Sequence, residues 1–230
     1  ASRHPRTNAP AMTVALKASF RLAHGQAPTP LPEPLPFTGD VYRDDDPELE
    51  CLEATDFAPW KPQADLLLKG TCHAPGGTPV GVCPVRFVVG DWMRTLLAFG
   101  PRDWRAGVSA PDVAEPFTRL PLGWTEAFGG PGFADNPVGR GFGGELLPRL
   151  EDEKRPLRQR GDTPASAGFG PVNRSRPLRR RKTGSYGGDY LKARWPGLPL
   201  DFDWSYHNAA PAEQQVRYLR GDEKLILQNL

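Results

Sequence analysis

Several features that define large classes of proteins are scarce in this sequence or missing from it. The 230 residues include only 3 cysteines, too few for the disulfide scaffold of a small secreted domain. No run approaches the roughly 18 apolar residues of a membrane span. The first five residues, ASRHP, lack the apolar stretch of a secretory signal. We therefore expect a cytoplasmic protein with no membrane partner.

A strong excess of one charge is also missing. Lysine and arginine number 29 and aspartate and glutamate 27, which gives a formal net charge of +2. This balance predicts no global attraction to nucleic acid or to an anionic membrane, although local patches can still attract either.

Glycine and proline, by contrast, are abundant. The 25 glycines and 27 prolines disfavour long helices, because proline lacks a backbone donor and glycine is entropically costly in regular elements. The chain is 38% hydrophobic and 10% aromatic, which is too apolar for a disordered polypeptide. Its length suits one large domain or two small ones.

Alternating apolar residues predict strands in the first hundred residues. From Met12 to Leu22 every second residue is apolar, which indicates a half-buried strand. Residues 27–36 carry prolines at alternate positions, and we expect an extended surface segment there. A role of this segment as a proline-rich ligand for another domain is the alternative.

The clearest sheet signal runs from Asp65 to Phe99. Apolar runs at 66–68, 82–89 and 92–99 predict a three-strand meander. The Gly90-Asp91 pair fits a two-residue turn with positive φ at the glycine. That turn places Val89 opposite Trp92, Phe87 opposite Arg94 and Val85 opposite Leu96, with one mostly apolar face.

Beyond Gly100 the apolar runs are short. Residues 100–183 are expected to be mostly irregular, and a loop of this length in a compact domain usually has a function or is partly mobile. A short helix is predicted at 186–195, ending before Pro196, and a closing hairpin from 216–219 and 224–227.

The predicted fold is mainly β. We expect an antiparallel sheet or β-sandwich wrapped by long glycine- and proline-rich loops, with one or two short helices. A flexible N-terminus (1–11) precedes a single domain (12–230). That domain comprises a β-rich core (12–99), an irregular wrap (100–183) and a closing part with the short helix and hairpin (184–230).

Metal and cofactor chemistry has little basis in the sequence. Cys72, His73 and Cys83 lack a fourth ligand and the paired spacing of zinc sites, so we expect thiols and no metal. Cys72 and Cys83 flank the same turn and are candidates to face each other. The glycine-rich runs at 129–132 and 139–144 do not match a phosphate-binding loop, so no cofactor is expected.

Three acids carry the enzyme alternative. Glu126, Asp201 and Asp203 are carboxylates of the kind that performs acid–base work when two of them converge. No histidine lies in a recognisable catalytic context, and no nucleophile elbow is present. Acids in such loops more often cap backbone donors or pair with arginine.

One block is strongly basic. Residues 174–182 carry six positive charges within nine residues. Three interpretations stay open: internal or solvated roles, including pairing with the acidic run between Asp40 and Glu50, an acidic protein partner, or nucleic acid.

Fifteen short motifs and single residues, in order along the chain, resemble one bacterial family. They cover roughly 12–230 and comprise Asp56-Phe57, Lys61, Asp65, Ala74-Pro75-Gly76-Gly77, Gly100-x-Arg102-x-Trp104, Pro116-Phe117, Pro121-Leu122, Glu126-Ala127-Phe128-Gly129-Gly130, Asn136-Pro137-x-Gly139-x-Gly141, Leu147-Pro148, Leu150-Glu151, Gly168-Phe169-Gly170-Pro171, Asp201-Phe202-Asp203, Asn208-Ala209-Ala210-Pro211 and Leu219-Arg220-Gly221-Asp222-Glu223. The family is DUF2169, a family of unknown function.

This resemblance implies an accessory protein of bacterial type VI secretion. Its members are expected to act in the cytoplasm as adaptors that load a toxic effector onto the spike, with the effector and a spike or PAAR-type tip protein as partners. The family has no established catalytic residues, so the resemblance implies binding without catalysis.

The residues of the wrap and the basic block suit an adaptor, because arginine and aromatic side chains supply much of the energy of protein interfaces. The same rings can instead bury the chain's own loops. The candidate partner-binding residues are Arg102, Trp104, Trp124, Glu126, Arg140, Arg179, Arg180, Arg181, Asp201 and Asp203.

Overall fold

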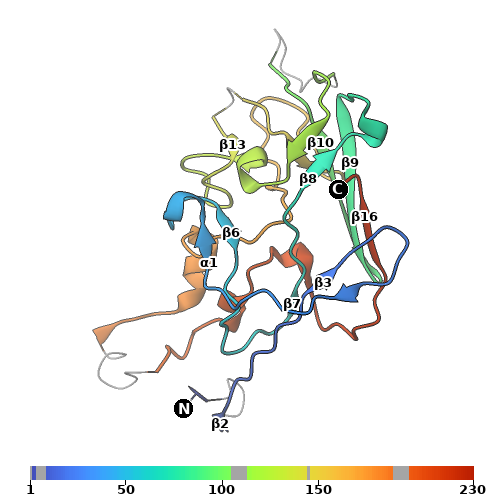
Figure 1. Ribbon diagram of the computed structural model, residues 1–230. Coiled ribbons are helices and arrows are strands. Elements are labelled where there is room, and N and C mark those ends of the chain that lie inside the picture. Colours follow the sequence, from blue (N-terminus) through green and yellow to red (C-terminus); the bar gives the residue numbers. More distant parts are fainter. Residues whose placement is uncertain (1, 4–8, 105–112, 144–145, 189–196) are drawn as a thin grey trace.

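The computed structural model describes residues 2–3, 9–104, 113–143, 146–188 and 197–230. The fold is mainly β, and nearly all of its strand pairs are antiparallel. The predicted fold class is therefore confirmed. In Figure 1, strands β9, β10 and β16 lie on one side of the molecule and helix α1 on the other.

The elements are short except for one hairpin. The strands are β1 (Ser2–Arg3), β2 (Pro10–Ala11), β3 (Phe20–Arg21), β4 (Thr29–Pro30), β5 (Val41–Tyr42), β6 (Cys51–Glu53), β7 (Ala64–Asp65), β8 (Thr71–His73), β9 (Val82–Val89), β10 (Trp92–Phe99), β11 (Arg119–Pro121), β12 (Phe128–Gly129), β13 (Arg140–Gly141), β14 (Leu150–Asp152), β15 (Gln215–Val216) and β16 (Leu225–Gln228). The α-helix is α1 (Pro177–Arg180), and the 3-10 helices are η1 (Arg43–Asp45), η2 (Pro75–Gly77), η3 (Trp124–Glu126), η4 (Arg181–Thr183), η5 (Trp204–His207) and η6 (Ala212–Gln214).

The β9–β10 hairpin forms the centre of a four-stranded sheet with the order β14-β10-β9-β16. Its register is the predicted one, with Val89 opposite Trp92 and the pairing continuing to Val82 and Phe99. Gly90 has a φ of 58°, the left-handed value that the two-residue turn requires.

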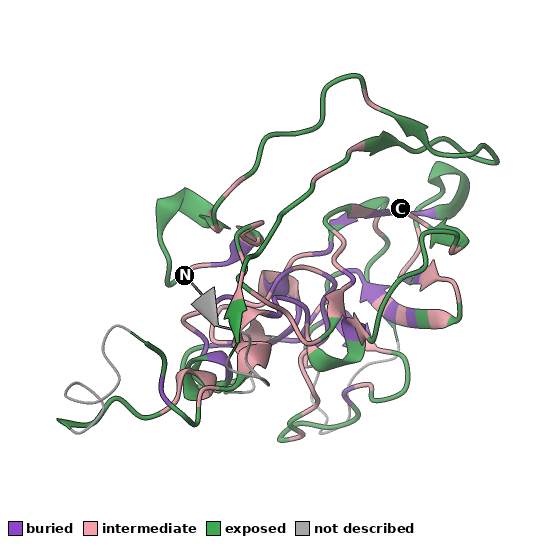
Figure 2. Ribbon diagram, turned by 90° about the horizontal axis from the view of Figure 1, so that it is seen from below, coloured by how far each residue is buried: buried purple, intermediate pink, exposed green. Residues whose placement is uncertain are grey.

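One face of this hairpin carries the core. Val85 and Leu96 are fully buried. The ring of Phe87 packs edge to face against the ring of Phe169 in the wrap, with the ring centres 5.9 Å apart. Arg94, opposite Phe87, is also buried on this face, where it donates to the carbonyl of Gly168 and to the side chain of Gln214. Figure 2 shows the buried residues gathered in the sheet and the adjoining loops.

Two predicted strand pairings are wrong. Residues 66–68 do not form the third strand of a meander, because the backbone N–H groups of Leu66 and Leu68 donate to the loop carbonyls of Gln214 and Phe169. The closing hairpin is also absent, since β15 pairs with β7 and β16 pairs with β9. Both segments find partners far away in the sequence.

The predicted half-buried strand at 12–22 is exposed instead. Residues 12–38 form an arm, which we call the N-terminal arm, and only β3 and β4 pair within it. Pairing stops there because the alternating prolines of 27–36 lack the N–H groups that a longer ladder needs. The extended surface segment at 27–36 is confirmed apart from this two-residue contact.

Two predictions fall partly outside the described residues. Of the expected flexible N-terminus, residues 1 and 4–8 lie outside them, while β1 pairs with β2. Residues 189–196 of the expected helix at 186–195 also lie outside them. The four-residue helix α1 was not predicted, because arginine-rich 174–182 has no apolar period.

Four buried side-chain amides join the loops of the wrap and its neighbours by hydrogen bonds. Asn136, Asn173, Asn208 and Gln214 are each at most 4% exposed. Each amide nitrogen donates two hydrogen bonds. That of Asn136 donates to Trp124 O and Phe128 O, and that of Asn173 to Pro47 O and Leu49 O. That of Asn208 donates to Gln63 O and Asp65 Oδ1, and that of Gln214 to Leu66 O and Phe169 O. These amides supply donors to backbone that has no ladder.

A volume change in the hairpin core has a predictable cost. Leu96→Ala should lower the free energy of unfolding by about 2–5 kcal/mol, because it leaves a cavity in a fully buried site. Met93→Ala on the same strand, where the side chain is 59% exposed, serves as the control and should change stability little. Urea denaturation followed by tryptophan fluorescence measures both, and equal effects of the two variants would contradict the assigned core.

The amide bridges are testable in the same way. Asn136→Asp keeps the size of the side chain but removes both N–H donors, so the buried carbonyls of Trp124 and Phe128 each lose a hydrogen bond and face a carboxylate instead. We expect a loss of about 2–4 kcal/mol in urea denaturation. Gln159→Glu, an exposed amide-to-acid change in the wrap, is the matched control. A stability of Asn136→Asp equal to that of the control would contradict the bridging role.

Candidate interaction site

Helix α1 divides the basic block into an inward and an outward half. Proline at the first helical position fixes the start of the helix. Positions three apart share a helix face, and here Arg176 and Arg179 are both 4% exposed whereas Arg180 and Arg181 are exposed. The predicted patch of six cations is therefore partly internal.

The inward half is held by specific contacts around Trp124. The guanidinium of Arg176 lies 4.2 Å from the centre of the Trp124 ring and donates to Asp135 O at 2.9 Å and to Asn136 Oδ1 at 3.0 Å. Burial lowers the pKa of Arg176 from 12.5 to about 10, so the side chain still carries its charge at neutral pH. Trp124 is 2% exposed and donates from Nε1 to Gly170 O.

Arg179 and Arg174 complete this inward half. Arg179 donates from Nε to Tyr206 O at 2.9 Å and from Nη1 to Val172 O. Arg174 pairs with Asp40 at 2.8 Å, and both guanidinium groups lie within 6 Å of the Tyr206 ring centre. The pairing of the basic block with the acidic run, one of the three open interpretations, is confirmed for Arg174.

A groove of about 660 Å³ opens beside α1. Its lining combines apolar side chains with cations and includes Trp124, Val172, Leu178, Arg176, Arg179 and Lys182. Leu178 is 45% exposed, and Asp135 and Glu213 add two acids to the wall. The groove thus offers apolar contact, positive charge and hydrogen-bond partners together.

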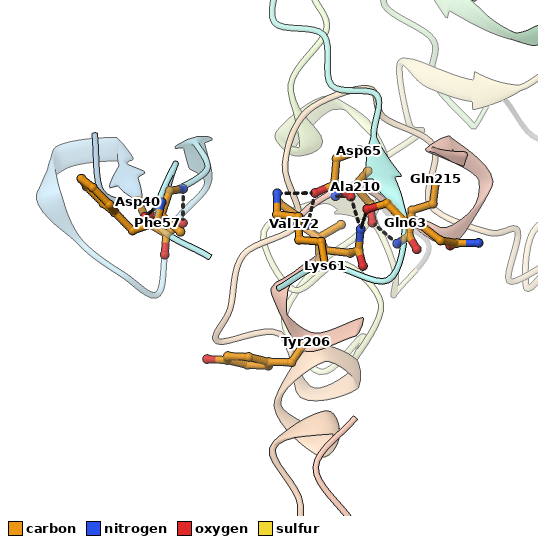
Figure 3. A network of polar contacts seen from close by, with 12 residues as sticks. Asp40, Phe57, Lys61, Gln63, Asp65, Val172, Tyr206, Ala210 and Gln215 are labelled. Atoms are coloured by element: carbon orange, nitrogen blue, oxygen red, sulfur yellow. Dashed lines mark hydrogen bonds and ion pairs between the residues drawn. The ribbon is translucent and has the colours of Figure 1, made fainter. Parts of the chain in front are cut away.

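A network of polar contacts at Asp65, which we call the Asp65 node, holds residues that line this groove (Figure 3). The carboxylate binds Lys61 Nζ at 2.8 Å and accepts from Asn208 Nδ2 and from the backbone N–H groups of Ala209 and Ala210. Asn208 and Ala210 both line the groove. The amide of Gln215 donates to Ala210 O, which fixes the same segment from its other side.

The two aspartates at 201 and 203 serve local structure at the end of the basic block. Asp203 accepts from Ser205 N as the N-cap of η5, and its own N–H donates to Lys182 O. Asp201 accepts from the backbone and the hydroxyl of Ser185, and these bonds lower its pKa below 3.8. Both aspartates therefore tie η5 and its approach to the segment after α1.

Glu126 has different partners from the two aspartates. Its Oε2 lies 3.2 Å from Arg140 Nη1 and 3.0 Å from Arg149 Nε. No contact joins Glu126 to Asp201 or Asp203 in the described part of the chain. The acids of the enzyme alternative are thus engaged separately, one with arginines and two with serines.

Two further candidates, Arg102 and Trp104, lie in the first part of the wrap. Arg102 is buried, stacks 3.7 Å from the Phe99 ring centre and pairs with Glu151. Trp104 lies under the guanidinium of Arg160, in the lining of a separate cavity of about 360 Å³. Of the ten candidates, Trp124 and Arg179 line the groove beside α1, whereas Arg102, Trp104, Glu126 and Arg140 have their partners outside its lining.

The cysteines are free and buried. Burial and a hydrogen bond with Cys83 raise the pKa of Cys72 to about 12, and burial raises that of Cys51 to about 11. The two thiols at 72 and 83 therefore lie together, as the sequence suggested, and the thiol of Cys72 stays protonated at neutral pH. Among the described residues, no cluster of histidine, cysteine and acidic side chains is suited to holding a metal ion.

Sequence reasoning missed His207 and the buried amides. His207 lies at the end of η5 against Phe202 and Trp204, and burial together with Arg174 and other cations lowers its pKa from 6.5 to about 4. Asn208 belongs to one of the motifs that carry the resemblance to the family, and this motif was the signal in the sequence for this region. No periodic pattern marks the other amides.

One of the comparisons with known proteins identifies the family. Residues 7–230 match the family model DUF2169, described as an uncharacterized protein conserved in bacteria. The chain belongs to this bacterial family. No curated protein and no solved structure matches it. Within the described residues, no helix has both the length and the apolar character to cross a membrane.

The position of His207 gives stability a defined pH dependence. Its pKa is about 4 in the fold and near 6.5 in the unfolded chain, so between these values the unfolded state binds more protons. Stability should therefore fall as the pH drops from about 6.5 toward 4, and His207 adds no pH dependence above that window.

Urea midpoints at pH 7.5 and pH 5 measure this effect. In His207→Gln the drop between the two pH values should be smaller than in the wild-type protein. His24→Gln, at an exposed position of the N-terminal arm, is the control and should keep the wild-type drop. An unchanged drop in His207→Gln would contradict the assigned environment.

Proposed function

We propose that this protein is a non-enzymatic adaptor, and that the groove beside α1 receives a segment of its cargo. The observation that carries the proposal is the groove itself, in which the partly exposed Leu178 and the cation Lys182 line one cavity. Exposed Arg180 and Arg181 lie on the adjoining outer side of α1. Aromatic and arginine side chains around a concave apolar surface are typical of protein-binding sites.

The chemistry of the groove indicates the kind of segment it binds. Apolar contact with Leu178 and Val172 suits an aliphatic or aromatic side chain, while Lys182 and the outer arginines suit a carboxylate beside it. The cargo segment is therefore an apolar residue flanked by acids. Arg174, Arg176 and Arg179 contact the protein's own carbonyls, rings or acids, which leaves fewer cations for the phosphates that a nucleic-acid binder must neutralise.

Family membership and the sequence motifs suggest the biological setting. We infer that the cargo is a type VI secretion effector, loaded in the bacterial cytoplasm onto a spike or PAAR-type tip protein. The separate engagement of Glu126, Asp201 and Asp203 supports binding over catalysis, because acid–base work by a carboxylate pair needs the two groups close together. Turnover of a substrate by the purified protein would contradict this inference.

Co-purification tests the proposal. Tagged protein, expressed with the effector and spike proteins encoded beside it, should recover at least one of them. Leu178→Asp combined with Arg181→Glu should reduce recovery about tenfold or more, because the change removes apolar contact and reverses charge at the groove. Arg119→Glu, an exposed charge reversal on β11, is the matched control and should recover wild-type amounts.

Failure to recover either partner would contradict the adaptor function. Recovery that is equal for the groove variant and the control would instead retain the adaptor function and contradict the groove as its site.

A further inference from the structure

The cavity of about 360 Å³ in the wrap has no role in the proposed function. Its lining brings together separate parts of the chain, namely Trp104, Phe128, residues 141–143, Leu157 and residues 160–163. A cavity of this volume lies in the range of small-molecule sites, which combine an apolar wall with a few polar groups. Both components are present here.

Aromatic rings form the apolar wall of this cavity. Phe128 is 3% exposed and packs edge to face against Phe133, which in turn contacts Phe142, and the ring centres are 5.2 Å apart in both pairs. Phe142 lines the cavity beside the half-buried Trp104 and is itself 44% exposed. Because aromatic rings pack favourably edge to face or offset against one another, this wall favours an aromatic ligand over an aliphatic one.

Glycines leave space beside this wall. Gly143 and Gly161 line the cavity with φ values of 101° and 94°, which residues with a side chain rarely adopt. A Cβ atom at either position would meet no atom within 4 Å. The backbone at these two positions therefore leaves room for an incoming molecule.

Two opposite charges in the lining have hydrogen-bonding capacity to spare. The guanidinium of Arg160 lies 5.3 Å from the Trp104 ring centre and forms no ion pair with any residue that the structure describes. Asp162 accepts through Oδ2 from the backbone N–H groups of Arg158 and Gln159, at 3.1 and 3.0 Å, and its Oδ1 stays available.

These two side chains complement a ligand that carries both charges. Arg160 and Asp162 are two positions apart in the chain, line the same cavity and do not pair with each other. Their charges sum to zero, so the lining attracts neither a plain anion nor a plain cation strongly. A zwitterion can instead satisfy both side chains at once, through charge-assisted hydrogen bonds.

We propose that this cavity binds a free aromatic α-amino acid. The carboxylate of the ligand pairs with Arg160, its ammonium group donates to Asp162 Oδ1, and its ring packs against the aromatic wall. An α-amino acid carries its two charges on one carbon atom, which suits two side chains so close in the chain. The site is separate from the α1 groove, and the inference goes beyond the adaptor function.

Isothermal titration calorimetry with L-phenylalanine as the probe tests the site. The wild-type protein should show one saturable site. N-acetyl-L-phenylalanine lacks the ammonium group and L-phenylalaninamide lacks the carboxylate, so each should bind about fivefold more weakly or worse. L-Alanine, which lacks the ring, should also bind more weakly. The first two analogues represent the two ends of a polypeptide, each with one charge only, and thus distinguish a free amino acid from a chain terminus.

Two conservative substitutions assign the charges. Arg160→Gln should weaken L-phenylalanine about fivefold or more but should not weaken L-phenylalaninamide, which has no carboxylate to lose a partner. Asp162→Asn keeps an oxygen for the two backbone N–H groups. It should weaken L-phenylalanine but not N-acetyl-L-phenylalanine. Arg158→Gln, at an exposed arginine outside the lining, is the matched control and should bind all probes like the wild type.

The groove variant shows whether the two sites are separate. Leu178→Asp combined with Arg181→Glu should bind L-phenylalanine like the wild-type protein. Circular dichroism confirms that each variant is folded, and the comparison of probes on the wild-type protein stays decisive if a variant does not fold.

Three results would overturn the proposal. One is the lack of saturable binding of L-phenylalanine up to its solubility limit. Another is equal affinity of the wild-type protein for L-phenylalanine and its two single-charge analogues. The third is binding that folded Arg160→Gln and Asp162→Asn variants leave unchanged. None of these results bears on recovery of the cargo, so the adaptor function and this site stand or fall separately.

Discussion

Much of this structure depends on one requirement, that the carbonyl groups of long loops find hydrogen-bond donors. Outside the four-stranded sheet the strands are two or three residues long, so ladders satisfy few of these groups. Buried amides and guanidinium groups do so instead, as Asn136 does for Trp124 and Phe128, and Arg179 for Val172 and Tyr206. Burying a carbonyl with too few donors costs free energy comparable to a lost hydrogen bond, so each bridge stabilises the loops that it joins.

The same requirement changes the interpretation of the basic block. The sequence left internal roles, an acidic partner and nucleic acid open for residues 174–182, and the fold uses Arg176 and Arg179 as donors to loop carbonyls and Arg174 as the partner of Asp40. What remains for a partner is the outer side of α1 and the groove beside it. The Asp65 node then fixes the floor of that groove through contacts with Asn208, Ala209 and Ala210.

The parts of the fold that local chemistry decides could be predicted. The β9–β10 hairpin, its register and its Gly90 turn follow from alternation and from a glycine at a position that needs positive φ. Pairing between distant segments could not be predicted, because no local pattern indicates which segments β16 and residues 66–68 bind.

The candidate site was predictable only in part, for a related reason. A sequence shows how many cations a block holds but not which of them face inward, and the side chain of Arg176 differs from that of Arg181 only in its surroundings. The amide bridges have no period and no composition signal. At residues 12–22 alternation indicated a strand, but half-burial also needs a covering partner, which the described chain does not supply.

The spacing of the amide bridges constrains where the chain can vary in length. Asn208 and Gln214 lie six positions apart and bind their own segment to two others, at 63–66 and at Phe169. An inserted residue between them would pull one amide out of reach of its acceptors. The described tip of the N-terminal arm around Gly25 forms no such amide bridge. Length differences among homologues, and the attachment of a fluorophore or tag, should therefore concentrate at that tip and avoid 208–214.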